Sequence, residues 1–153
     1  MIHYRLSKHS DCQELAPNLR QADKDEVFAS NGLSPLEALQ ASYEVSQDCY
    51  TITDREGKTI GMFGVADNGV FSSPWMLASD GILSIQKAFL RQGKEWVEDI
   101  AQKNPVLINY VHRDNDKAIR WLKFLGFTFT ALVPEYGVGK EPFYQFVRVT
   151  PNV

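Results

Sequence analysis

The segment 115–127, NDKAIRWLKFLGF, constrains the fold of this chain more than any other segment. Apolar residues recur in it at spacings of three and four, which is typical of one side of a helix of about three turns. These residues are Ala118, Ile119, Leu122 and Leu125. Asp114 or Asn115 is placed to cap the start of this helix, and Gly126 is placed to end it in the left-handed conformation.

The remaining patterns predict an α/β chain in which strands and helices alternate. Strands are predicted at 2–6, 49–53, 59–65, 70–78, 106–111, 127–133 and 143–149. Two helices are predicted before residue 46, separated at Asn31-Gly32, and a long helix is predicted over 83–103. Gly61 and Gly64 within one strand indicate a bulge or the close approach of another backbone.

The order β-α-α-β-β-β-α-β-α-β-β predicts one mixed sheet of the α+β kind in a single domain over 1–153. The strand–helix–strand succession in the second half predicts a parallel pairing with a right-handed crossover.

Composition excludes several classes of protein. Hydrophobic residues make up 44% of the chain and its formal net charge is −3, which argues against a nucleic-acid-binding protein. No apolar run approaches the ~20 residues of a membrane span, and we expect a cytoplasmic protein. Cys12 and Cys49 fit reduced thiols, and no spacing of His and Cys predicts a metal site.

The residues Asn115, Ala118, Gly126 and Phe127, in the order of elements around them, resemble the C-terminal block of the GNAT N-acetyltransferase superfamily. The resemblance implies the GNAT acyl-CoA N-acyltransferase fold over almost the whole chain, with acetyl-CoA as cofactor and an amine as acceptor. In that family the sheet splays between the strands that correspond to 75–78 and 107–111, and the pantetheine arm of the cofactor lies there.

The resemblance also implies a phosphate-binding turn at 78–84. It assigns cofactor binding to Leu77, Ala78, Ser79, Gly81, Ser84 and Asn115. Free amides and glycines at a helix N-terminus capture anions, but this turn has one glycine, no arginine and the acidic Asp80. The alternative is that Asp80 or Ser84 caps the following helix and occupies those amides.

Catalytic groups are less evident than the fold. Leu122 stands where many GNAT enzymes have the tyrosine that protonates the departing thiolate, which leaves Tyr110, Tyr136 and Tyr144 as candidate acids. The strand at 70–77 holds no carboxylate, so the candidate bases are Glu44, Asp48, Asp80 and His112. Each of these residues also fits an ordinary structural or surface role.

Several longer stretches are similar to a family of small proteins from T7-like bacteriophages. Members of this family are described as Gp13-like proteins, internal virion proteins or acetyltransferases. The similar stretches are 19–27, the SPLEAL run from Ser34, 59–65, 73–80 and 107–127. This resemblance implies a role in the infected cell or in the virion. Two hypotheses follow: an acetyl-CoA-dependent enzyme, or an inactive GNAT-fold protein that binds a phage or host protein. An exposed strand at 143–149 is a candidate homodimer interface.

Overall fold

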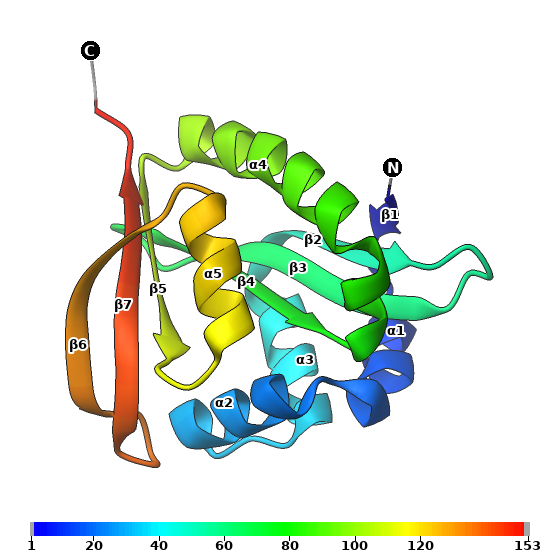
Figure 1. Cartoon of the computed structure of the whole chain (residues 1–153), viewed down its shortest axis with the longest axis horizontal. Coiled ribbons are helices and arrows are strands. Elements are labelled where there is room, and N and C mark those ends of the chain that lie inside the picture. Colours follow the sequence, from blue (N-terminus) through cyan, green and yellow to red (C-terminus); the bar gives the residue numbers. More distant parts are fainter. Residues whose placement is uncertain (1, 152–153) are drawn as a thin grey trace.

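A computed structural model of the chain describes residues 2–151 and contains one seven-stranded mixed sheet covered by helices (Figure 1). The strands are β1 (His3–Leu6), β2 (Ser46–Thr53), β3 (Thr59–Asp67), β4 (Ser72–Ala78), β5 (Val106–His112), β6 (Thr128–Tyr136) and β7 (Glu141–Val149). The α-helices are α1 (His9–Leu15), α2 (Gln21–Asn31), α3 (Pro35–Val45), α4 (Gln86–Lys103) and α5 (Asp116–Phe124). Two 3₁₀-helices complete the set, η1 (Ala16–Asn18) and η2 (Asp80–Ile85).

The strand order is β1-β2-β3-β4-β5-β7-β6, and among the strand pairs of residues 2–151 only β4–β5 is parallel. β4 and β5 share a single register pair, Ser72 with Leu107, whereas the antiparallel pairs on either side run the length of their strands. The two central strands therefore diverge toward their C-terminal ends and open the middle of the sheet (Figure 1).

Helices cover both faces of the sheet. On one face, α1 and α3 pack through Leu15 and Leu39 against Met62 and Leu77. On the other face, α4 and α5 bury side chains such as Phe89, Val97 and Trp121 against β3, β5 and β7. Among the described residues, no helix combines the length and hydropathy needed to cross a membrane.

Local capping signals are confirmed. Ser34 and Glu37 form a reciprocal capping box at the start of α3, with Pro35 in the first turn. Gly32 and Gly126 adopt positive φ angles of 69° and 100° after α2 and α5. Glycine has no Cβ to penalise this conformation, so it ends both helices at the expected positions.

Several predicted boundaries are wrong. The first predicted helix, in which Pro17 is expected either to lie near the start or to break the helix, is divided into α1 and α2 by the 3₁₀-turn η1, which contains Pro17. The long helix begins at Gln86 instead of Leu83, since η2 occupies 80–85. The predicted strands 127–133 and 143–149 are too short at the hairpin end, because β6 continues to Tyr136 and β7 begins at Glu141.

The strand at 143–149 is not an exposed edge. β7 lies between β5 and β6 and pairs with both, so its backbone has no free side for a second copy of the chain. The outer strands of the sheet are β1 and β6.

Candidate active site

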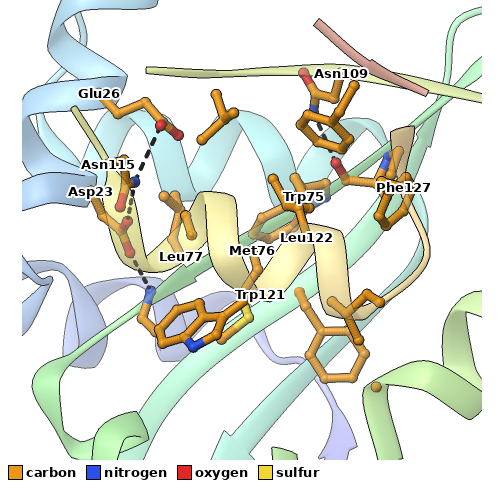
Figure 2. Close-up of a pocket in the computed structure, with 18 of the residues that line it drawn as sticks. Asp23, Glu26, Trp75, Met76, Leu77, Asn109, Asn115, Trp121, Leu122 and Phe127 are labelled. Carbon is orange, nitrogen blue, oxygen red and sulfur yellow. Dashed lines mark hydrogen bonds between the residues drawn. The ribbon is translucent and has the colours of Figure 1, made fainter. Parts of the chain in front are cut away.

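A cavity of about 280 Å³ passes through the sheet where β4 and β5 diverge (Figure 2). On the α4–α5 side it is lined by Met76, Phe89, Trp96, Ala118, Trp121 and Leu122. On the α2 side it is lined by Glu26, Val27, Trp75, Tyr110, Tyr136 and Phe143. A molecule in this cavity can reach both faces of the sheet.

The edge of β4 presents the N–H and the C=O of one residue, Met76, to the cavity. Ser79 N donates to Ile60 O across the β3–β4 ladder at 2.9 Å, so by alternation the amides and carbonyls of residues 74, 76 and 78 point toward β5. Asn109 Nδ2 donates to Pro74 O at 2.8 Å and thereby fills one of these positions. Among the described residues, β4 and β5 have no register pair beyond Ser72–Leu107, so the N–H and C=O of Met76 face the cavity without a partner in the β-ladder.

The end of the same edge is covered by the turn before α2. Arg20 N donates to Ala78 O at 2.8 Å, and Ala78 N donates to Asp23 Oδ2 at 3.1 Å. Leu19 and Ser79 form an isolated antiparallel bridge beside them. Leu77 and Ala78, both expected to bind the cofactor, line the cavity. The backbone groups of Ala78 are engaged, and the Leu77 side chain also packs in the core beside α1 and α3.

A buried polar network connects this edge to α2 and α5 (Figure 2). Arg20 Nη1 donates to Asp23 Oδ1 at 3.0 Å, and Arg20 Nη2 donates to Asn115 Oδ1 at 3.3 Å. Asn115 Nδ2 donates to both Asp23 Oδ1 and Glu26 Oε1, at 3.3 and 3.2 Å. Asn115 precedes α5, but its side chain makes no capping bond, because these partners take its hydrogen-bonding capacity.

Glu26 is the carboxyl group that this network presents to the cavity. Its Oε1 also accepts a hydrogen bond of 2.8 Å from His112 N, at the end of β5. Desolvation, and then the nearby Asp23 charge, raise the Glu26 pKa to about 7, against the weaker effect of these hydrogen bonds. Desolvation likewise raises the pKa of Asp23. A carboxyl group whose pKa lies near neutral pH can accept and release a proton under cellular conditions.

Aromatic rings form the α2-side wall beside Glu26. Trp75 of β4 and Tyr110 of β5 both line this wall. The Tyr110 ring stacks on Tyr136 at a centroid distance of 4.4 Å, and Tyr136 lies against Phe143 at 4.7 Å. Burial raises the pKa of Tyr136, so this phenol stays protonated at neutral pH.

Of the predicted catalytic residues, only Tyr110 and Tyr136 lie together in the cavity. The His112 ring bonds to Glu141 Oε1 at 2.8 Å and accepts from Asp114 N, and its backbone amide alone reaches Glu26. Asp80 is exposed at the start of η2. The remaining candidates, Glu44, Asp48 and Tyr144, are not among the residues that line this cavity.

The predicted phosphate-binding turn is folded into η2. Ser79, and not Asp80 or Ser84, caps it, because Ser79 Oγ accepts from Gly81 N at 3.2 Å. Ser84 Oγ donates to Gly81 O at 2.8 Å on the exposed side. A Cβ on Gly81 would come within 2.9 Å of Ile60 Cγ2, so packing against β3 already accounts for this glycine.

Sequence reasoning missed Arg20, Asp23 and Glu26. Their spacing of three residues was the available signal, because it places three charged side chains on one side of a predicted helix. An exposed helix carries the same pattern, so the spacing alone does not identify a buried cluster.

Solved structures of acetyltransferases share this fold. The chain superposes on the ribosomal-protein-S18-alanine N-acetyltransferase of Escherichia coli with a TM-score of 0.71 and 13% identity, covering 100% of this chain and 97% of that one. For Ard1 of Thermoplasma volcanium the TM-score is 0.67 and the identity 19%, with 99% of both chains covered. The Salmonella typhimurium protein yncA is considered an acetyltransferase and was solved with its cofactor acetyl-CoA. This chain superposes on it with a TM-score of 0.73 and 15% identity, covering 100% of this chain and 96% of that one.

These likenesses confirm the GNAT-like mixed α/β fold. No protein-family model matches the sequence, and no curated protein matches it at a significant level.

Proposed function

We propose that this chain transfers an acetyl group from acetyl-CoA to an amine. The observation that carries the proposal is the pairing of two features across one cavity: the unpaired Met76 N–H on β4 and the Glu26 carboxyl group on α2. Acyl transfer to an amine needs a donor for the developing oxyanion and a base for the amine proton. The shared fold with acetyltransferases supports the same reaction class.

Each group has a defined role in this reaction. The Met76 N–H donates to the carbonyl oxygen of the acetyl group, where negative charge develops as the amine attacks. A C–N bond forms, the amine proton passes to Glu26, and the C–S bond breaks to release the thiolate of CoA. Tyr136, or Tyr110 beside it, supplies the proton that this thiolate takes up. Leu122 lines the cavity but has no proton to give.

The cofactor would lie along the β4 edge with few polar contacts. Its pantetheine arm would bond to Met76 and pass Leu77 and Ala78, and its phosphates would lie beyond them near Ser79, Gly81 and Ser84. Because η2 engages the amides of this turn, we infer that Lys87 and Arg91 of α4 supply the positive charge for the phosphates, whereas the Lys94 ammonium lies over the Phe124 ring. In this proposal Asn115 acts indirectly, by holding Glu26 and Asp23.

Thermal unfolding with and without acetyl-CoA tests the proposal. Ligand at about 100 times its dissociation constant adds about 2.7 kcal/mol to stability, which raises the midpoint of a chain of this size by roughly 5 to 10 °C. Acetylation of a panel of primary amines, followed by release of the CoA thiol, then tests turnover. An unchanged midpoint at millimolar acetyl-CoA would exclude the enzyme. Tyr110→Phe and Tyr136→Phe should each be made singly. The variant that slows the reaction identifies the tyrosine that acts as the acid.

A second candidate is a GNAT-fold protein without catalysis. The closure of the β4 edge at Ala78 by Arg20 and Asp23 favours it, as does the capping of η2 by Ser79. Following the resemblance to bacteriophage proteins, we infer for this case a phage or host protein as partner, in the infected cell or in the virion. Affinity capture from infected cells, combined with absence of acetyl-CoA binding, would support this candidate over the enzyme.

A further inference from the structure

The charges around Glu26 do not balance among the described residues. The polar network contains one guanidinium, Arg20, and two carboxyl groups, Asp23 and Glu26. Arg20 forms its ion pair with Asp23 at 3.0 Å and lies over the Trp121 ring at 5.1 Å. Within residues 2–151, Glu26 forms no ion pair, and its direct partners are the neutral donors His112 N and Asn115 Nδ2. The cavity is therefore one positive charge short when both carboxyl groups are ionised.

The wall next to Glu26 suits an organic cation. Trp75, Tyr110, Tyr136 and Phe143 line this half of the cavity, and aromatic rings attract ammonium groups. Trp75 is fixed in place, because its Nε1 donates to Ser46 Oγ at 2.7 Å and Ser46 Oγ donates to Ser42 O at 2.6 Å. Tyr110 is fixed by the bond from Gln145 Nε2 to its hydroxyl at 2.9 Å. The rings are thus held before any ligand arrives.

The same half of the cavity is closed against a polypeptide. The β6–β7 hairpin is attached to the end of α2 by hydrogen bonds from Val138 N to Ser30 O, at 3.1 Å, and from Gly139 N to Ala29 O, at 2.9 Å. Gly137 touches the Ser30 backbone so closely that a Cβ there would overlap it. A peptide would need an open groove between the hairpin and the helix, and this contact closes such a groove. The cavity that remains has a volume of about 280 Å³, which is small for a ligand-binding site.

We propose that the acceptor half of the cavity binds a small primary alkyl- or arylalkylammonium ion, with Glu26 contacting its charge and the rings of Trp75, Tyr110 and Tyr136 surrounding its carbon atoms. This inference rests on the proposed function, because the bound ammonium becomes the acceptor amine once it has lost one proton to solvent, and Glu26 then takes the second proton as the amine attacks. It excludes the N-terminus of a protein as acceptor.

Calorimetric titration without acetyl-CoA tests the site separately from catalysis. The probes are phenethylammonium, its neutral counterpart 2-phenylethanol, and an unstructured hexapeptide with a free N-terminus. We expect phenethylammonium to bind at least 10-fold more tightly than either of the others. Equal binding of the ammonium and the alcohol would overturn the inference, and so would tighter binding of the hexapeptide.

Variants and pH locate the site. Glu26→Gln should weaken phenethylammonium binding at least 10-fold, and Tyr136→Leu about 2- to 30-fold, while Asp25→Asn on the exposed side of α2 should change neither binding nor stability. In the unmodified protein the affinity should fall from pH 8 to pH 5.5 as Glu26 takes up a proton. The groups around it that also carry charge or titrate are Arg20, Asp23, Tyr110, Tyr136 and the His112–Glu141 pair. A pH dependence that persists in Glu26→Gln would assign the effect to one of these and overturn the role of Glu26.

The two proposals fail in different ways. If phenethylammonium binds but acetyl-CoA does not raise the unfolding midpoint, the cation site is supported and the transferase activity is excluded. If the protein transfers acetyl groups but binds phenethylammonium no more tightly than 2-phenylethanol, the transferase activity is supported and the cation site is excluded.

Discussion

The backbone N–H of His112 donates a hydrogen bond of 2.8 Å to Glu26 Oε1, and this contact joins the end of β5 to α2. In a continuous parallel sheet this amide would pair with the neighbouring strand. Here β4 has already diverged, with Ser72–Leu107 as the last paired position, so the amide is available to a side chain. The splay therefore creates the cavity and also fixes the carboxyl group that faces it.

The stability of the protein should fall as pH rises from about 4.5 to about 7, and Glu26 should be the cause. Its pKa is about 7 in the folded chain, against 4.5 for a glutamate side chain in water. Over this window the folded state keeps a proton that the unfolded state has released, so the free energy of unfolding decreases with pH. A pKa difference of that size changes the free energy of unfolding by about 3 kcal/mol. Urea unfolding at pH 5 and pH 8 measures it.

Glu26→Gln should remove that pH dependence, because the amide cannot ionise yet its oxygen can still accept from His112 N and Asn115 Nδ2. The variant should be about as stable as the unmodified protein at pH 5 and more stable at pH 8. Asp25→Asn removes a carboxyl group from the exposed side of the same helix and should leave the pH dependence intact. The same slope in both variants would show that Glu26 is not the group responsible.

Met76→Pro should abolish the proposed oxyanion donor without unpairing β4 from β3. The Met76 N–H points toward the cavity, and Pro74 already occupies an equivalent position two residues earlier on the same edge. Loss of one such donor lowers kcat by about 10²- to 10³-fold. Met76→Leu keeps the N–H and a similar volume and should retain most of the activity. Equal rates in the two variants would contradict the role of this amide.

The fold was predictable where the information is local. The alternation of apolar residues and the capping signals at Ser34, Glu37 and Gly126 each act within a few residues of the chain, and they predicted the element order and most of the helix ends. The site was less predictable, because Asn115 is separated by 92 residues from Asp23 and by 89 from Glu26. A lone asparagine before a helix is typical of a cap, and only the folded chain brings it to these two carboxyl groups.

Asn115→Ala should destabilise the protein by about 2 to 4 kcal/mol. It leaves Asp23 and Glu26 with one hydrogen bond fewer each in a desolvated site, and an unpaired buried charge costs more than a lost surface contact. The Glu26 pKa should rise further, because a hydrogen bond to its charged form is lost. Chemical denaturation at pH 7 checks the stability. Asn18→Ala is the control, since its side chain makes only a 3.4 Å bond on the surface and should cost little.

Gly64→Ala should be more damaging than Gly61→Ala, although both lie in β3. A Cβ on Gly64 would meet Asp48 O at 2.5 Å and Trp75 Nε1 at 3.1 Å, where β2 has a register shift between Ser46 and Asp48. A Cβ on Gly61 would meet Ala78 Cβ at 3.6 Å, an ordinary contact.

Overpacking of this kind costs about 1 to 3 kcal/mol, whereas Gly61→Ala should stay within about 1 kcal/mol of the unmodified protein. The added Cβ would also crowd both atoms of the bond that holds Trp75, its Nε1 and Ser46 Oγ, so Gly64→Ala should shift the tryptophan fluorescence and weaken phenethylammonium binding. If Gly64→Ala bound phenethylammonium normally, Trp75 would not be a fixed wall of the acceptor site.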